Sequence, residues 1–122
     1  MKLSLVAIDK QGFIRVATDG NITSAAFNGD ATGKALMEGA LGSTWAANRV
    51  LLDMTKTNYI DSTAIGWLIS SNKQFKSNGG QLVIHSVQPA VRAVLDLLKI
   101  GKVVAIVDDE TAAKALVTGA GR

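Results

Sequence analysis

The polar residues best suited to take part in chemistry are the consecutive Asp61, Ser62 and Thr63. They stand between a short apolar run, residues 50–54, and an amphipathic segment that begins at Ile65. The Ser62 hydroxyl can accept a hydrogen bond or a phosphoryl group, and its position favours it as the N-cap of a following helix. Capping explains the serine without any function, so its spacing alone indicates a structural cap.

Asp61 and Thr63 each have a structural and a functional interpretation. Asp61 can be a turn residue whose carboxylate accepts hydrogen bonds from nearby backbone N–H groups. It can equally position the Ser62 hydroxyl and contact a partner. Thr63 is expected at the first helical position, where a hydroxyl is more often structural, so it is the secondary candidate for modification.

Other kinds of reactive site are weakly supported. The chain has one histidine, His85, and no cysteine, so neither a transition-metal site nor a Ser-His-Asp triad is expected, and His85 is interpreted as a packed or solvated side chain. Residues 29–35 superficially resemble a phosphate-binding P-loop. They are one residue short between the glycines, and no Ser or Thr follows Lys34. We therefore expect no cofactor, no metal and no catalytic residue.

A strand and a helix must position the polar corner. The apolar run at residues 50–54 is typical of a strand buried on both faces of a parallel sheet. Beyond the corner, the apolar residues fall on one side of a 3.6-residue helix; they are Ile65, Leu68, Ile69 and Phe75. Asp61, Ser62 and Thr63 then lie beyond the carboxyl end of a central strand, which is where open α/β sheets usually bind ligands.

Trp67 is the most unusual residue of this expected helix. It follows Ile65 by two positions and is therefore turned about 200° from it, away from the apolar stripe. The indole either lies along a neighbouring helix or forms a half-exposed binding hot spot. Because the helix geometry points Trp67 away from the sheet, we expect Trp67→Ala to weaken the binding of a partner protein. The same change should alter the free energy of unfolding by under about 0.5 kcal/mol.

The rest of the chain predicts further strands and helices. Two strand-like runs, residues 3–8 and 13–17, are joined by a polar turn that ends in Gly12, which indicates a β-hairpin. Residues 18–48 are weakly patterned and predict loops with one weak helix over residues 32–41. The remaining expected elements are a helix end at residues 77–80, a strand at 81–85, a helix from Pro89 to Gly101 with one face formed by Val91, Val94, Leu95 and Leu98, a strand at 103–107, and a helix capped by Asp108 and Asp109.

This order of elements predicts an α/β fold built on a mixed sheet. The sheet should have about five strands, an N-terminal antiparallel hairpin followed by parallel strands, with about four flanking helices and right-handed crossovers. At 122 residues the chain is expected to form one domain over residues 1–118, with a frayed tail at 119–122.

Charge and hydropathy limit the expected partners. The net charge is +3, from 13 basic and 10 acidic residues, and the basic residues are scattered, so nucleic-acid binding has little support. The N-terminus lacks the apolar run of a signal peptide, and no run approaches the length of a membrane span. We therefore expect a cytoplasmic protein that contacts neither nucleic acid nor a membrane.

Several stretches of the sequence resemble a known family. They are Leu52-Asp53-Met54, the run Ile60-Asp61-Ser62-Thr63-Ala64-Ile65-Gly66-Trp67-Leu68, the turn Gly79-Gly80-Gln81-Leu82 and the helix start Gln88-Pro89-Ala90-Val91. Together they resemble the motifs of STAS domains, the anti-sigma-factor antagonists of bacteria. The similarity covers about residues 3–117, is strong over 50–98 and is faint over 19–48. Ala64 replaces the usual glycine of the motif, a change that a helix tolerates well.

The resemblance implies a STAS fold and a phosphorylation-controlled binding switch that is not an enzyme. In the family, the serine after the motif aspartate is phosphorylated by an anti-sigma factor that is also a serine kinase, and this serine corresponds to Ser62. The unphosphorylated protein would sequester that kinase, and a serine phosphatase would reset the switch. The implied binding surface comprises Asp61, Ser62, Thr63, Trp67 and the segment Asp19, Gly20, Asn21, Ile22 and Thr23.

Two alternatives remain open. STAS domains also serve as scaffold or sensor subunits of larger stress-signalling assemblies. A small nucleotide-binding α/β protein would use the same edge of the sheet, although the incomplete P-loop and the absence of cysteine argue against it.

Overall fold

The computed structural model describes residues 2–9, 12–27, 29–30 and 33–118. Within these residues, the strands are β1 (Lys2–Ile8), β2 (Phe13–Asp19), β3 (Arg49–Lys56), β4 (Gln81–His85) and β5 (Ala105–Ile106). The helices are α1 (Lys34–Leu41), α2 (Ser62–Ser77), α3 (Pro89–Leu97) and α4 (Glu110–Thr118), with short 3₁₀ helices at Ser24–Phe27, Trp45–Ala47 and Ile100–Lys102. The predicted tail at 119–122 lies outside the described residues, as does Thr32, the first residue of the predicted weak helix.

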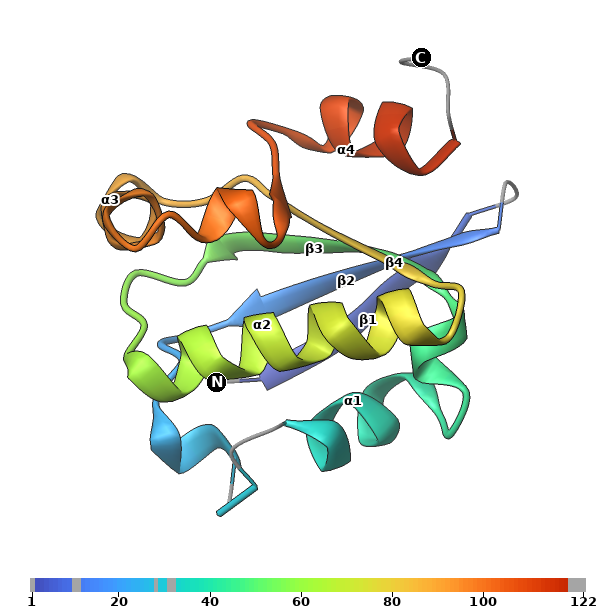
Figure 1. Ribbon diagram of the computed structural model, residues 1–122, viewed down its shortest axis with the longest axis horizontal. Coiled ribbons are helices and arrows are strands. Elements are labelled where there is room, and N and C mark those ends of the chain that lie inside the picture. The colour runs from blue at the N-terminus through green and yellow to red at the C-terminus, as the bar shows by residue number, and fades with distance from the viewer. Residues whose placement is uncertain (1, 10–11, 28, 31–32, 119–122) are drawn as a thin grey trace.

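The five strands form one sheet in the order β1-β2-β3-β4-β5 (Figure 1). Strands β1 and β2 are antiparallel, whereas β2–β3, β3–β4 and β4–β5 are parallel. This arrangement confirms the predicted mixed sheet with an N-terminal hairpin. All carboxyl ends of β2, β3, β4 and β5 therefore meet at one edge of the sheet, which we call the carboxyl edge.

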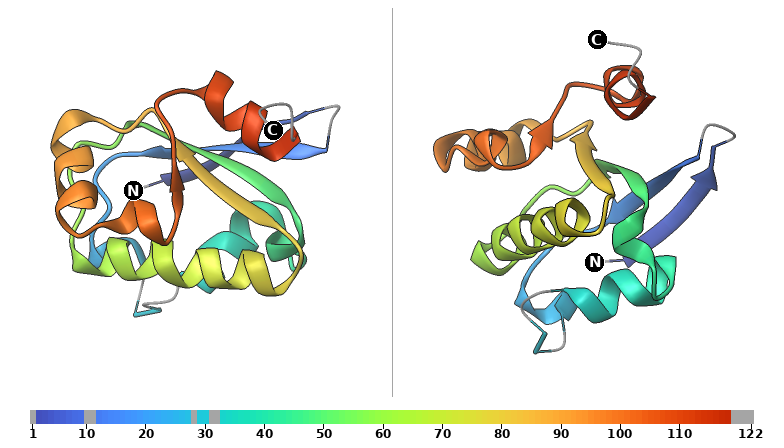
Figure 2. Two further views of the ribbon diagram at one scale, coloured as in Figure 1. Left: turned by 45° about the horizontal axis from the view of Figure 1, so that its top comes forward. Right: turned by 45° about the vertical axis from the view of Figure 1, so that its right-hand side comes forward.

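The alternation of side chains along β3 supplies two cores. Val50, Leu52 and Met54 belong to the large cluster that also contains buried residues of α1, α2 and α3. Leu51 points to the other face, where it packs with Val83 and with residues of α4. Figures 1 and 2 show the same layering, with α1 and α2 on one side of the sheet and α4 on the other. A strand buried on both faces explains why the run at 50–54 is uniformly apolar.

Two predicted boundaries near the C-terminus are wrong. The last strand is β5, Ala105–Ile106, and not residues 103–107, because Val103 lies in a turn with its side chain exposed. Helix α3 ends at Leu97, before Gly101, and a left-handed residue, Lys99 with φ 56°, leads into the following 3₁₀ helix. Leu98 was expected on the buried face of α3 but is 53% exposed, because Ile100 takes the core position instead.

Candidate functional site

The loop between β3 and α2 is tied to the loop that follows β2. Ile22 and Ile60 form an isolated parallel bridge. The Ile22 N–H donates to the Tyr59 carbonyl at 3.0 Å, and the Asp61 N–H donates to the Ile22 carbonyl at 3.1 Å. These bonds place the segment 19–23 next to the start of α2, so two predicted parts of the site, far apart in the sequence, lie side by side.

Asp61, and not Ser62, is the N-cap of α2. One Asp61 carboxylate oxygen accepts a hydrogen bond from the Ala64 N–H at 3.1 Å, and the other accepts from the Ser24 N–H at 2.9 Å. The prediction that Ser62 caps the helix is therefore wrong by one residue. The carboxylate thus caps α2 and also fixes the 3₁₀ helix Ser24–Phe27 against it. This agrees with the structural interpretation of Asp61 as an acceptor for backbone N–H groups.

Ser62 is the first residue of α2, and its side chain is exposed. Among the described residues, its hydroxyl makes no hydrogen bond. Thr63 is the second helical residue, not the first as expected, and is only partly exposed. It lines a small hollow of about 140 Å³ together with Ser24, Phe27 and Gly29. Of the two hydroxyls, that of Ser62 is the more accessible.

The segment 19–23 divides into exposed and buried positions. Asp19 and Asn21 are exposed, whereas Gly20 and Thr23 are partly covered. The Ile22 side chain is 0% exposed and belongs to the main core. Ile22 was expected on the binding surface, but its side chain anchors the loop, because apolar burial and the bridge to Ile60 fix it inward.

The prediction of a half-exposed Trp67 is wrong. The indole is 1% exposed, and its ring centroid lies 5.6 Å from that of Phe27 with an angle of 51° between the ring planes. The edge of the indole lies against Gly33, the N-cap of α1. Trp67 does point away from the sheet, but the 3₁₀ helix Ser24–Phe27 and the start of α1 form a further layer there and cover it. The alternative of an indole packed along a neighbouring element is correct.

Tyr59 is an exposed residue that was not predicted as part of the site. Its side chain is 56% exposed and stands in the loop just before Asp61. Nothing in the spacing of the apolar residues marks it. An aromatic residue in the linker between a buried strand and a capped helix would have been the available signal, because interfaces are enriched in exposed tyrosine.

His85 occupies the same edge of the sheet but is buried. It ends β4, is 1% exposed, and its Nδ1 lies 2.8 Å from the Ser86 hydroxyl oxygen. Burial lowers the pKa of His85 below its ordinary value of 6.5, and the carboxylates of Asp53, Glu110 and Asp109 oppose this shift only in part. His85 is therefore neutral near pH 7, and the prediction of a packed histidine agrees with this position.

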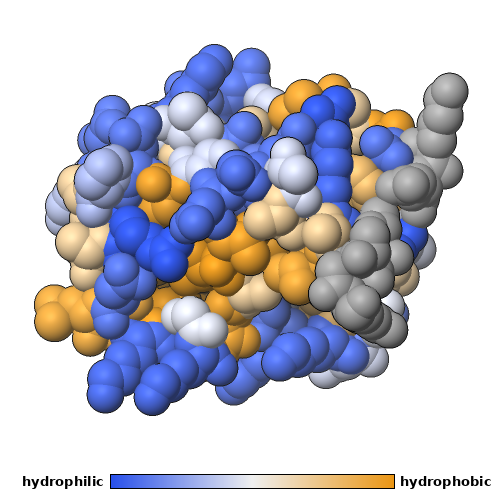
Figure 3. Space-filling view, turned by 90° about the horizontal axis from the view of Figure 1, so that it is seen from above, coloured by the Kyte–Doolittle hydropathy of each residue, from blue (hydrophilic) through white to orange (hydrophobic). Residues whose placement is uncertain are grey.

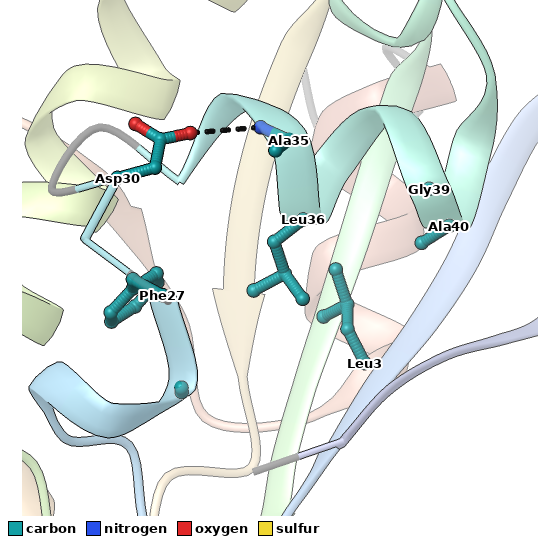
Figure 4. A pocket seen from close by; sticks show the side chains of 8 residues that line it. Leu3, Phe27, Asp30, Ala35, Leu36, Gly39 and Ala40 are labelled. Atoms are coloured by element: carbon teal, nitrogen blue, oxygen red, sulfur yellow. Dashed lines mark hydrogen bonds between the residues drawn. The ribbon is translucent and has the colours of Figure 1, made fainter.

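A hollow of about 390 Å³ lies between α1 and β1 (Figure 4). Its wall is largely hydrocarbon, supplied among others by Leu3, Phe27 and Leu36. The one carboxylate on its lining, Asp30, accepts a hydrogen bond from the Ala35 N–H at 3.0 Å. Because no second ionisable residue is found among the described residues that line the hollow, these bring together no catalytic pair.

The start of α2 combines an accessible hydroxyl, a capped helix and a neighbouring loop at one place on the surface. Within the described residues, no three His, Cys, Asp or Glu side chains are grouped as they would be around a metal ion. The sequence model of the STAS domain family matches residues 7–113. The chain belongs to the STAS domain family.

Solved structures share this STAS fold. The chain is similar to a proposed anti-sigma factor antagonist of Thermotoga maritima, with a TM-score of 0.73, 20% identity and 91% of each chain covered. It is also similar to an anti-sigma-factor antagonist (STAS) domain protein of Planctomyces limnophilus, with a TM-score of 0.71, 20% identity, and 96% of this chain and 99% of that chain covered. The unphosphorylated form of the anti-sigma factor antagonist SpoIIAA gives a TM-score of 0.58 at 10% identity, covering 98% of this chain and 99% of that chain.

No helix of the described part of this STAS domain is both long and apolar enough to cross a bilayer. Asp61, Ser62 and Thr63, which resemble the family motif, lie at the carboxyl edge of the STAS fold, with the Ser62 side chain exposed. The geometry adds two facts that the motif does not contain, namely the double hydrogen bonding of Asp61 and the pairing of its loop with Ile22.

Proposed function

We propose that this STAS domain is an anti-sigma factor antagonist whose binding to an anti-sigma factor is switched by phosphorylation of Ser62. The unphosphorylated domain binds an anti-sigma factor that is also a serine kinase and so releases a sigma factor. Phosphorylation by the same kinase ends the complex, and a serine phosphatase restores it. Because the kinase uses ATP, the cycle operates in the cytosol. The domain itself acts by binding and not by catalysis.

The accessibility of the Ser62 hydroxyl is the observation that carries this proposal. A kinase must bring the hydroxyl oxygen in line with the transferred phosphoryl group, so the side chain has to be exposed and free to turn. Ser62 meets both conditions, because it is exposed and its hydroxyl is engaged with no described residue. Thr63, which is partly covered, is the secondary acceptor.

The charges around Ser62 suit a switch. A phosphoserine carries about −1.5 to −2 charges near pH 7, and the N-terminal end of a helix stabilises a neighbouring anion. The Asp61 carboxylate stands beside it and already accepts two backbone hydrogen bonds. The helix end therefore favours the phosphate, and the Asp61 carboxylate adds to the negative charge that a partner packed against this turn would meet.

The proposed partner surface surrounds Ser62 on both loops. It consists of Asp61, Ser62, Thr63 and Tyr59 together with Asp19, Gly20, Asn21 and Thr23. Trp67 and Ile22 contribute to it only by holding the loops in place, since both side chains are buried. Tyr59 supplies the exposed aromatic group that Trp67 was expected to supply.

A binding and phosphorylation assay with a candidate anti-sigma factor kinase from the native bacterium tests the proposal. We expect the wild-type domain and Ser62→Ala to bind, Ser62→Asp to lose at least about tenfold in affinity, and mass spectrometry to place the phosphate on Ser62. Ser77→Asp, an exposed serine at the opposite end of α2, is the matched control and should bind as the wild type does. A dominant phosphosite elsewhere, or a Ser62→Asp variant that binds the kinase as tightly as the wild type, would contradict the proposal. Tight binding of a nucleotide, measured by calorimetry, would favour a nucleotide-binding protein instead.

A further inference from the structure

The most exposed apolar side chains of α3 lie where this helix ends. Leu97 is 80% exposed, Leu98 is 53% exposed, and Val103, in the turn that follows, is 43% exposed. We call residues 97–103 the leucine corner. Figure 3 shows hydrophobic residues projecting at its lower left, at the end of the molecule where α3 lies in Figure 1. These side chains protrude from the surface.

The charges of the leucine corner are positive. Lys99 and Lys102 are both exposed and lie in the sequence between Leu98 and Val103. The nearest acidic residue in the sequence, Asp96, already forms an ion pair of 3.1 Å with Arg92. Lys73 adds a further exposed cation on α2, next to Asn72, which contacts the corner. Within residues 97–103 no acidic side chain offsets the two lysines.

The fold holds the leucine corner in this outward orientation. Leu95 and Ile100, on either side of the leucine pair, are 0% and 4% exposed and occupy the core. The Asn72 side-chain amide donates to the Val103 carbonyl at 2.8 Å, which fixes the turn to α2. The core positions are thus already filled, and Leu97 and Leu98 have no inward site to occupy without displacing them.

We propose that the leucine corner is a contact site for an anionic lipid surface. Projecting leucines enter the boundary between head groups and acyl chains, and flanking lysines meet the anionic head groups. A bilayer accepts protruding side chains without a complementary hollow. A protein interface of ordinary size needs about 800 Å² on each partner, and three exposed apolar residues supply little of that area. This contact would be peripheral and reversible, and it would revise the expectation that the domain meets no membrane.

Co-sedimentation with vesicles tests the lipid contact. The wild-type domain should bind vesicles that contain phosphatidylglycerol at least about tenfold more strongly than vesicles of phosphatidylcholine alone, and added salt should weaken the binding. Lys99→Gln/Lys102→Gln should lower the partition coefficient by roughly 30-fold, from the usual contribution of two lysines near an anionic surface. Leu97→Ser/Leu98→Ser should lower it by about tenfold or more.

Matched variants separate the corner from general effects of charge and hydropathy. Lys2→Gln/Lys34→Gln removes the same charge from exposed lysines of β1 and α1, and Leu116→Ser removes an exposed leucine of α4. Both controls should bind vesicles nearly as the wild type does, and urea midpoints should show that every variant is folded.

Three results would overturn the inference. They are equal binding to the two vesicle types, equal loss in the control and corner variants, and self-association in light scattering that the leucine variants abolish, which would assign the corner to a second copy of the chain. The Ser62 assay contains no lipid, so failure of either proposal leaves the result for the other readable.

Discussion

Two adjacent turns of α2 have opposite environments. At the first turn, Ser62 is exposed and its hydroxyl is engaged with no described residue. One turn later, Trp67 is 1% exposed and packs between Phe27 and Gly33. Both residues lie on one helix, and the apolar pattern of that helix predicts neither the exposure of Ser62 nor the burial of Trp67. What separates them is the layer of Phe27 and Gly33, which covers the second turn and leaves the Ser62 side chain exposed.

The difference shows that α2 is buried on two sides. Ile65, Leu68 and Phe75 face the sheet, as an amphipathic stripe requires. Trp67 faces the layer formed by the 3₁₀ helix Ser24–Phe27 and α1. The Asp61 carboxylate accepts a hydrogen bond from the Ser24 N–H and so holds one end of this layer against α2. Asp61, the N-cap of α2, therefore also helps to keep Trp67 covered.

The largest expected effect is on the buried turn. Trp67→Ala should lower the free energy of unfolding by about 3–5 kcal/mol, because a large aromatic side chain leaves a cavity. Urea unfolding measures this loss, and Trp67→Phe, which keeps a ring against Phe27, is the milder control. A loss under about 0.5 kcal/mol would mean that the indole is free in solution and that the two turns do not differ.

Gly33 tests the same contact from the other side. A Cβ at Gly33 would lie 2.0 Å from the Trp67 indole Cδ1, and its φ of 69° is unfavourable for other residues. Gly33→Ala should therefore destabilise the wild type by more than about 1 kcal/mol. In the Trp67→Ala background only the backbone strain remains, so a double-mutant cycle should show a smaller loss there. Purely additive losses would contradict the contact.

The Asp61 cap should have the next largest effect. Asp61→Ala removes acceptors for the Ala64 and Ser24 N–H groups, and loss of an N-cap costs about 0.5–2 kcal/mol. Asp61→Asn, which keeps one side-chain oxygen, is the matched control and should lose less. If Asp61→Ala were neutral while Ser62→Ala was destabilising, the cap would have to be reassigned to Ser62.

The sequence was sufficient for the elements that rest on local patterns. The run at 50–54 predicted β3, Pro89 predicted the start of α3, and Asp109 caps α4 as expected, since its carboxylate accepts from the Ala112 N–H at 2.9 Å. These features depend on neighbours within a turn or a strand, so they are visible in a single sequence. The weak helix was also found, because α1 falls within residues 32–41.

The errors lie where distant segments meet. Trp67 and Ile22 were placed on the surface because nothing in the weakly patterned residues 18–48 predicted a layer over α2 or a bridge to Ile60. Ser62 was taken as the cap because Ser and Asp are both good caps and stand side by side. Only the backbone decides between them, and it places Asp61 outside the helix with φ −109°.

His85 is a buried titratable group at the same carboxyl edge of the sheet as the exposed Ser62. Its folded pKa is lowered by burial, so the unfolded chain binds the proton more readily. The contribution of His85 to the free energy of unfolding should be constant above about pH 6.5. Below that pH it should fall, by at most about 1.4 kcal/mol per pH unit. Urea unfolding between about pH 5.5 and 7.5, above the range of ordinary carboxylates, measures the slope. His85→Gln should remove it, and a slope of opposite sign would mean that the charged form is favoured.

The smallest expected effect on folding concerns Ser62, and it sharpens the contrast between the two turns most directly. Because Asp61 is the cap and the Ser62 side chain is exposed, Ser62→Ala should change the free energy of unfolding by under about 0.5 kcal/mol. Ser62→Asp should be similarly stable, since an acidic residue suits the first turn of a helix. The same two substitutions should separate in function, with Ser62→Ala abolishing most of the phosphate label and Ser62→Asp weakening partner binding. A residue that is neutral for folding and decisive for binding belongs to the surface, whereas Trp67 should behave in the opposite way. If Ser62→Ala destabilised the domain as strongly as Asp61→Ala does, the hydroxyl would be structural and the case for a freely accessible phosphoacceptor would fall.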